Sequence, residues 1–200
     1  MHIFHINLQK QSDEQLLLYL KRGDRFPSLG KGSGEEYFDE IYRRYARRLH
    51  GFFFRQLGGD ANRAADATHD VFLRLYESRE RYIEGSNAAT WIFTIAYNLC
   101  KNQYRHNAYV ADYLATLDLE PTEEQQTEIH MDRDTLHNAL REVLDSLPDP
   151  LHQLFSLRHE EELTVPQIAT IMDIPEGTVK SRLHKAMTII RKQLKQYEEK

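Results

Sequence analysis

No part of this chain restricts its possible folds more than the segment from Thr164 to Leu194, whose sequence is TVPQIATIMDIPEGTVKSRLHKAMTIIRKQL. Thr164 followed three residues later by Gln167 is a capping-box pattern, which marks the start of a helix. Apolar residues then recur at helical spacing through Met172, and Pro175 ends this helix but suits the first turn of another. The pattern predicts a short helix, a tight turn and a longer helix, which is the layout of a DNA-binding helix-turn-helix.

The second helix of this motif separates apolar from basic residues. Its apolar residues share one face at about 100° per residue: Val179, Leu183, Ala186, Met187, Ile190 and Leu194. Between Gly177 and Gln196 there are six Lys or Arg and no acid. A helix in the major groove needs cations for phosphates and short polar or Arg side chains for base edges. We therefore predict DNA contacts from Thr178, Lys180, Ser181, Arg182 and Lys185. The alternative is an ordinary amphipathic surface helix, which the capped partner helix and the Pro-Glu-Gly turn disfavour.

Composition sets the broad class of the protein. The chain has 200 residues, of which 40% are hydrophobic, enough for one large packed domain or two small ones. No apolar run approaches the length of a membrane span, and the start lacks the pattern of a secretory signal, so we expect a cytoplasmic protein. The single cysteine, Cys100, excludes an internal disulfide and a cysteine-based zinc site.

The charge is unevenly distributed along the chain. Although the net charge is −5, residues 107–134 hold eight acids and one base, a net −7, so the remainder of the chain is +2. The overall acidity therefore does not argue against nucleic-acid binding, because the pieces on either side of this acidic segment are neutral to basic.

Helical periodicity extends through nearly the whole chain, with no convincing run of period 2. We predict an all-α fold: two small helical domains joined by an acidic flexible linker, the C-terminal one a four-helix domain that includes the helix-turn-helix. The predicted helices before that motif span residues 12–22, 35–57, 62–78, 88–106, 136–147 and 150–159. The predicted divisions are an N-terminal extension with a short helix (1–34), a first domain (35–106), the linker (107–134) and a second domain (135–200).

The helix predicted at 35–57 has an apolar stripe beside a basic face. The stripe consists of Phe38, Ile41, Tyr42, Tyr45, Leu49 and Phe52. The basic face consists of Arg43, Arg44, Arg47 and Arg48. The helix therefore has distinct apolar and basic faces.

Three segments in this order resemble the bacterial extracytoplasmic-function (ECF) sigma factors, the two-domain specificity subunits of RNA polymerase. They are AADATHDVFLRLY, TWIFTIAYNLCKNQYR and the stretch that ends in GTVKSRLHKA, and the resemblance covers the chain from about Glu35 to Leu194. It implies a sigma factor that binds core RNA polymerase and directs promoter-specific initiation through −10 and −35 elements. The helix-turn-helix would then bind the double-stranded −35 element. The alternative is a stand-alone helix-turn-helix regulator whose first half dimerises or senses a ligand.

The resemblance also gives the first domain two binding surfaces. The loop at 84–87 would hold a flipped base of the −10 element, and the following helix would contact the non-template strand. The expected −10 contacts are Arg81, Tyr82, Asn87, Asn98, Lys101, Asn102 and Arg105. For Tyr82 and for Trp91 the alternative is a place in the core.

The expected core-polymerase contacts lie on the predicted helix at 62–78. They are Asp66, His69, Asp70, Phe72 and Arg74. Without the resemblance, these charges would simply form a solvated helix face.

No arrangement of residues in the sequence suggests catalysis by this chain. The ten histidines do not converge on a metal-ligand pattern, and no catalytic triad, phosphate loop or nucleotide fingerprint is present. We therefore expect no enzyme activity, cofactor, metal or small-molecule substrate. The expected partners are core RNA polymerase and promoter DNA, and an anti-sigma factor is a further candidate.

Overall fold

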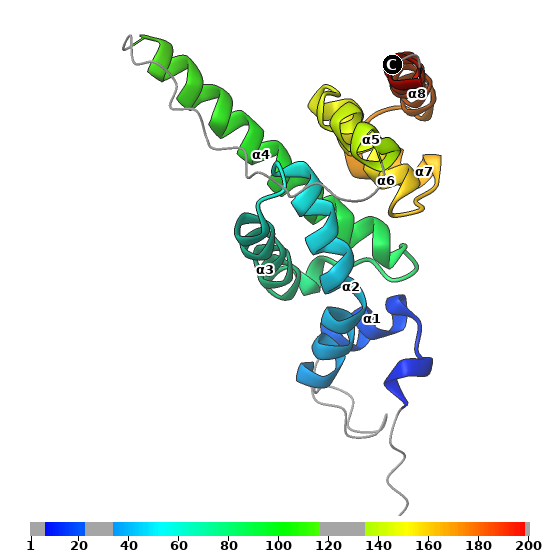
Figure 1. Cartoon of the computed structure of the whole chain (residues 1–200). Helices are drawn as coiled ribbons and strands as arrows, with labels where there is room; N and C mark the ends of the chain where they lie inside the picture. The colour runs from blue at the N-terminus through cyan, green and yellow to red at the C-terminus, as the bar shows by residue number, and fades with distance from the viewer. Residues whose placement is uncertain (1–6, 23–33, 117–134, 199–200) are drawn as a thin grey trace, which may run out of the picture.

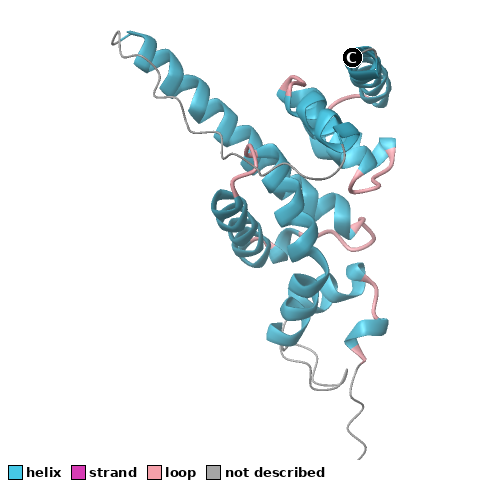
Figure 2. Ribbon diagram, in the orientation of Figure 1, coloured by secondary structure: helices cyan, strands magenta, loops and turns pink. Residues whose placement is uncertain are grey.

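A computed structural model gives the fold of residues 7–22, 34–116 and 135–198 (Figure 1). Side chains are described for residues 7–22, 34–102 and 140–195. Its principal helices are α1 (Asp13–Arg22), α2 (Gly34–Gln56), α3 (Ala61–Glu77), α4 (Ala88–Thr116), α5 (Thr135–Asp145), α6 (Asp149–His159), α7 (Val165–Met172) and α8 (Glu176–Glu198). Two short 3-10 turns, η1 (Leu8–Lys10) and η4 (Arg79–Arg81), accompany them. The described residues contain no strand, as Figure 2 shows, so the predicted all-α fold is confirmed.

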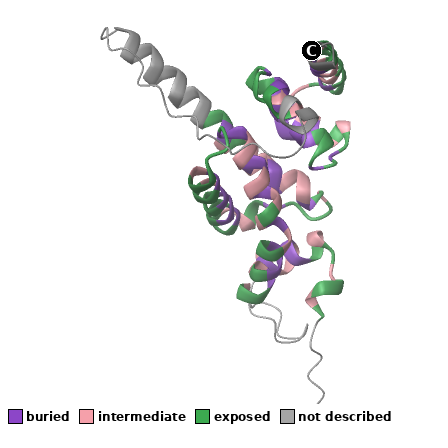
Figure 3. Cartoon of the chain, viewed as in Figure 1, coloured by how far each residue is buried: buried purple, intermediate pink, exposed green. Residues whose placement is uncertain are grey.

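The first domain is built around the pair α2 and α3, which pack against each other and against α4. The turn between α2 and α3 uses Gly58 and Gly59, whose φ angles of 69° and 81° favour glycine. Asp60 then caps α3, because its carboxylate accepts hydrogen bonds from the backbone N–H groups of Asn62 (2.9 Å) and Arg63 (3.0 Å). Apolar side chains from α1 to α4 fill the core. The buried residues of these helices are coloured purple in Figure 3.

The N-terminal helix α1 is part of this packing. Leu16, Leu17 and Leu20 are buried in the same core as α2. Ser12 caps the helix, because its hydroxyl accepts a hydrogen bond from the N–H of Gln15 (3.2 Å) and its own N–H donates to the Gln15 side chain (3.0 Å).

Arg44, on the expected basic face of α2, binds the N-terminal segment of the chain. Its guanidinium donates to Asp13 (2.7 Å) and Glu40 (2.7 Å), and to the backbone carbonyls of Leu8, Gln9 and Gln11. Because the partners of Arg44 lie within the chain, this arginine fixes the N-terminal segment onto α2.

Two details of the first domain differ from the sequence pattern. Tyr42, although part of the apolar stripe of α2, is 47% exposed. Helix α4 ends at Thr116 instead of His106, so residues 107–116 are helical where a linker was expected. The rest of the expected linker, 117–134, lies outside the described residues.

The second domain consists of α5 to α8 and contains the predicted helix-turn-helix as α7 and α8. The Gln167 side-chain oxygen accepts a hydrogen bond of 2.8 Å from the backbone N–H of Thr164, as the capping-box pattern predicts. It also accepts one of 2.8 Å from the Thr164 hydroxyl. Pro175 does not itself stop α7: the helix has already ended at Asp173, whose φ of 53° lies in the left-handed region. The Pro175 carbonyl instead accepts the first hydrogen bonds of α8.

The two domains pack against each other in this structure. Helix α4 contacts α7, and α2 contacts α6. One continuous cluster of buried side chains extends from Leu16 in α1 to Val179 in α8.

Candidate promoter and polymerase surfaces

The polar face of α8 is accessible to a ligand. Val179, Ala186 and Ile190 bury its apolar face against the rest of the second domain. The predicted contacts lie on the other side: Lys180, Ser181 and Lys185 are exposed, and Thr178 and Arg182 are half-buried. The helix therefore presents a basic surface that a DNA major groove can accept.

The loop between η4 and α4 is fixed at both ends. At its start, the Lys21 ammonium donates a hydrogen bond of 2.6 Å to the backbone carbonyl of Tyr82. At its end, Asn87 caps α4 by accepting hydrogen bonds from the N–H (2.9 Å) and hydroxyl (3.0 Å) of Thr90. The Glu14 carboxylate accepts from the N–H of Ala88 (3.2 Å). The loop is thus held in one shape before any ligand arrives.

The expectation that Tyr82 contacts DNA does not fit the structure. Its side chain is 1% exposed, its ring packs against that of Trp91 at 5.2 Å between centroids, and its hydroxyl donates to the Ser86 carbonyl (2.6 Å). Burial accordingly raises the pKa of this phenol. Tyr82 supports the loop from beneath, as the alternative interpretation held, and a buried ring cannot stack on a base.

The other expected −10 residues whose side chains are described are all exposed: Arg81, Asn87, Asn98, Lys101 and Asn102. The Arg105 side chain lies outside the described residues. The sequence reasoning overlooked Ile83, which is 72% exposed at the start of the loop. Its place in the sequence, between Tyr82 and the polar residues 84–87, could have indicated an exposed apolar side chain.

The charged face of α3 is also accessible. Asp66, His69, Asp70 and Arg74 are exposed, as their helical spacing predicts. Phe72 is only 2% exposed, so its ring offers little surface of its own, and its contact with core polymerase stays a prediction. Its ring lies 4.6 Å from that of Tyr42 and 6.0 Å from that of Phe38, all centroid to centroid.

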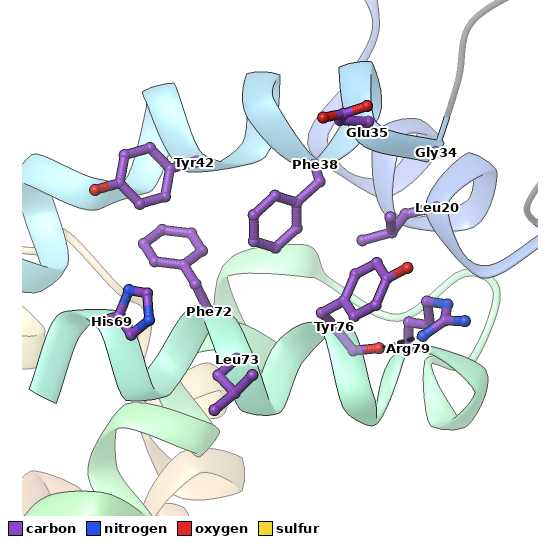
Figure 4. A pocket seen from close by; sticks show the side chains of 10 residues that line it. All are labelled: Leu20, Gly34, Glu35, Phe38, Tyr42, His69, Phe72, Leu73, Tyr76 and Arg79. Carbon is purple, nitrogen blue, oxygen red and sulfur yellow. Dashed lines mark hydrogen bonds between the residues drawn. The ribbon is translucent and has the colours of Figure 1, made fainter.

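An aromatic groove runs beside this charged face, between α2 and α3 (Figure 4). Its volume is about 820 Å³, and Phe72 forms part of its floor. Tyr42, Leu73 and Tyr76 line it and are 47%, 50% and 46% exposed. Leu73 and Tyr76 stand three residues apart, off the buried stripe of α3, and this spacing could have revealed them. Exposed apolar side chains that share a groove are typical of a protein-binding surface.

The described residues offer little for covalent chemistry. They contain no group of three or more His, Cys, Asp or Glu side chains arranged to hold a metal ion. Cys100 is buried, and this burial raises the pKa of its thiol to about 12, so the nucleophilic thiolate is suppressed at neutral pH.

Comparison with known proteins identifies both halves of the chain. Residues 41–109 match the family model described as Sigma-70 region 2, and residues 137–190 match that described as Sigma-70, region 4. The chain is 32% identical over 160 residues to ECF RNA polymerase sigma factor SigL of Mycobacterium tuberculosis, covering 76% of this chain and 85% of that protein. The chain belongs to the ECF sigma factors.

One further relative is similar in sequence, and one solved structure is similar in fold. The sigma factor is 28% identical over 201 residues to the RNA polymerase sigma-H factor of Pseudomonas aeruginosa, covering 94% of this chain and 96% of that one. It shares its fold with the sigma factor RpoE of Bartonella quintana, solved in complex with the anti-sigma factor NepR, with a TM-score of 0.64 and 20% identity over 79% of this chain and 96% of that one.

Membership of this family confirms the predicted function. The sigma factor binds core RNA polymerase and directs promoter-specific transcription initiation through −10 and −35 elements. A stand-alone regulator is not supported, since the first half of the chain matches a sigma region instead of a separate sensing domain. None of the described helices is long and apolar enough to cross a membrane.

Proposed function

We propose that three surfaces divide the work of this sigma factor. The basic face of α8 binds the double-stranded −35 element. The loop at 84–87 and the exposed face of α4 bind the separated non-template strand of the −10 element. The charged face of α3 and the aromatic groove beside it bind core polymerase. The observation that carries this assignment is the exposure of all three surfaces within one chain whose two halves match sigma regions.

The −10 surface favours separated DNA over duplex for a physical reason. A base held out of the stack costs a few kcal/mol, which contacts in a preformed pocket offset. The loop at 84–87 provides that rigidity, because Lys21 and Glu14 fix its two ends. Lys101 then supplies a cation for the strand backbone, and Asn98 and Asn102 supply polar groups beside it.

The polymerase surface combines apolar contact with a polar rim. Tyr42, Leu73 and Tyr76 supply apolar area that a partner would bury, while Asp66 and Asp70 add carboxylates at the edge. Aromatic side chains of this kind contribute strongly to the energetics of protein interfaces. No covalent step is required of this chain, so we expect no enzymatic activity from it.

The partner of the RpoE structure suggests a regulator as well. That sigma factor was solved with an anti-sigma factor bound. We propose that this chain is likewise controlled by an anti-sigma factor, and co-purification from cells that express the tagged chain tests this.

Binding to core polymerase tests the assignment of the α3 surface. Asp70→Lys should weaken binding of the full chain to core polymerase roughly tenfold, whereas Asp39→Lys, at an exposed acid on α2 outside the groove, should not. Affinity of both variants for a −35 duplex should equal that of the wild type. Equal losses by both variants would contradict the assignment. Start-site mapping with the wild type and core polymerase on a fragment library would then define the promoters.

A further inference from the structure

Helix α1 contacts the chain on both sides of the −10 loop, which is residues 84–87. At the start of α1, the Glu14 carboxylate accepts a hydrogen bond of 3.2 Å from the N–H of Ala88, the first residue of α4. Near its end, the Lys21 ammonium donates a hydrogen bond of 2.6 Å to the carbonyl of Tyr82, ahead of the loop. Because Lys21 follows Glu14 by seven positions, about two helical turns, both side chains lie on one side of α1.

A third contact from α1 reaches the loop itself, but it is weaker. Arg22 pairs with Glu84 at 3.1 Å, and the two side chains are 37% and 67% exposed. Exposed ion pairs contribute little, because water and salt screen them. The bonds made by Lys21 and Glu14 are partly buried and join a charged group to the backbone, and such bonds are roughly twice as strong as neutral ones. The anchoring contacts are therefore those of Lys21 and Glu14.

Helix α1 is itself fixed on the first domain. Three of its leucines are buried in the core: Leu16, Leu17 and Leu20. At its first residue, the Asp13 carboxylate accepts hydrogen bonds from Arg44 (2.7 Å) and from the Tyr45 hydroxyl (2.5 Å) of α2. Since α1 cannot shift without breaking these contacts, its side chains hold the ends of the −10 loop at fixed points.

Hydrogen bonds within the loop region determine its shape. The Ser86 N–H donates to the Ile83 carbonyl (3.0 Å), and Gly85 permits this turn with a φ of 85°. The Tyr82 hydroxyl donates to the Ser86 carbonyl (2.6 Å). These bonds lie inside the turn, whereas the contacts of α1 act at its two ends. The contacts of α1 therefore fix where the turn lies relative to α4.

The placement of the loop matters for recognition of a base outside the stack. Such a base is recognised by contacts inside a pocket, and the groups that make them must be placed within about 0.5 Å. A loop that is ordered in advance also avoids the cost of becoming ordered when the strand binds. Loosening the ends of the loop should therefore reduce both its affinity for the separated strand and its discrimination among bases.

We propose that α1 is a positioning helix for the −10 loop, in which Lys21 and Glu14 hold the backbone at Tyr82 and Ala88 and so set the base selectivity of the loop. The two side chains act through the backbone of the loop and not by contact with the strand. Helix α1 lies before residues 41–109, the segment that matches Sigma-70 region 2. The role rests on the proposed function, in which the loop binds the separated strand of the −10 element.

Binding of single strands to the holoenzyme tests this role. The probes are fluorescent oligonucleotides that carry the −10 element of a promoter mapped with the wild type, and the same strands with each base replaced in turn. Lys21→Met keeps the apolar stem without the donor, and Glu14→Ala removes the acceptor. Each should lower the discrimination at the most selective base about tenfold, which corresponds to one charge-assisted hydrogen bond. Lys21→Arg and Glu14→Gln, which can still donate and accept, should recover most of it.

Salt dependence separates positioning from a direct contact between Lys21 and a phosphate. If Lys21 bound a phosphate, Lys21→Met would weaken all strands equally and lower the slope of log affinity against log salt concentration by about 0.7. That result would overturn the proposal, which expects an unchanged slope and a loss of discrimination. Lys10→Met, at an exposed lysine of η1, removes the same charge and should behave as wild type. An equal loss of discrimination in Lys10→Met would also overturn the proposal.

Two further measurements complete the test. All variants should bind core polymerase as tightly as the wild type, which shows that they are folded. In the free chain, amide hydrogen exchange at Ala88 should be faster in Glu14→Ala than in Glu14→Gln. A wild-type holoenzyme that binds all strands alike would overturn the proposed function, and this role with it. A wild type that discriminates, with Lys21→Met and Glu14→Ala equal to it, would overturn the role of α1 alone.

Discussion

At the scale of single residues, Glu40 is a buried carboxylate held by two arginines of its own helix. It is 8% exposed and accepts hydrogen bonds from Arg43 (2.8 and 2.7 Å) and Arg44 (2.7 Å). The hydrogen bond from Arg43, with that from Arg44 and the nearby positive charges, outweighs the cost of burial and lowers the pKa of Glu40 to about 2. The stabilisation from this depressed pKa is present above the ordinary value of 4.5 and is lost as the pH falls through about 2.

This pKa gives the first prediction. Between about pH 5 and pH 2 the free energy of unfolding should fall more steeply for wild type than for Glu40→Gln, because only wild type must protonate this carboxylate. Urea denaturation across that pH range measures the difference. Parallel curves for the two proteins would show that Glu40 does not have a depressed pKa.

Ile83 gives a second prediction at this scale. Apolar side chains that face DNA can enter a base step and favour strand separation, and Ile83 is 72% exposed beside the −10 loop. Ile83→Ser should reduce the rate of promoter opening by core polymerase roughly tenfold, or about 1.4 kcal/mol, while Ile83→Leu should retain it. Fluorescence of a base analogue in the −10 element reports opening. An unchanged rate for Ile83→Ser would leave this side chain without a role in opening.

At the scale of elements, α8 gives the third prediction. Arg182→Ala or Lys185→Ala should cost about 1–3 kcal/mol of affinity for a −35 duplex if the contact is to a base edge, and should relax specificity there. If the contact of Lys180 is to phosphate, Lys180→Ala should weaken binding to all duplex sequences about equally. It should also reduce the slope of log affinity against log salt concentration by about one. Titrations of the duplex at several salt concentrations separate the two cases. Lys195→Ala, near the C-terminal end of α8, is the control.

Helical elements were predictable from sequence wherever local chemistry determines them. The Thr164–Gln167 cap and the double glycine with Asp60 placed helix ends within a residue or so, because these signals act over three or four positions. The C-terminal end of α4 was not predictable, since no glycine or proline follows His106 until Pro121. The exposure of Tyr42 does not follow from the sequence, because periodicity identifies an apolar residue but not which neighbouring helix covers it. Tyr82, which the resemblance placed at DNA, is instead buried beside Trp91.

At the scale of the whole molecule, the arrangement of the domains was not predictable from this one sequence. Arg48 of α2 donates a hydrogen bond of 3.0 Å to the Glu161 carboxylate, which lies 113 positions further along the chain. Nothing in the sequence near either residue predicts this contact. Arg48 was assigned to a basic face of α2, and Glu161 received no role. The exposed charged faces of α3 and α8 follow from helical spacing, because each lies on a single helix, whereas the aromatic groove and the contact between domains require the tertiary structure.

The packing of the second domain on the first should depend on pH through Glu161, whose buried carboxylate accepts hydrogen bonds from Arg48 (3.0 Å) and Arg55 (3.3 Å) of α2. Burial raises the pKa of Glu161 above its ordinary value, even though Arg48 and Arg55 favour its ionised form. The packed arrangement therefore binds the proton more tightly than an arrangement with the domains apart. Packing of the domains is favoured at low pH and becomes less favourable as the pH rises through the raised pKa.

The fraction of molecules with packed domains can be measured from the distance between spin labels at Asn62→Cys on α3 and Lys192→Cys on α8, both exposed positions. This fraction should increase as the pH falls from neutral toward about 4.5, by at most tenfold per pH unit for one proton. Glu161→Gln should abolish this dependence, because its amide does not titrate. A packed fraction that instead decreases on acidification in wild type, but not in Glu161→Gln, would show that attraction to Arg48 and Arg55 outweighs desolvation of the carboxylate.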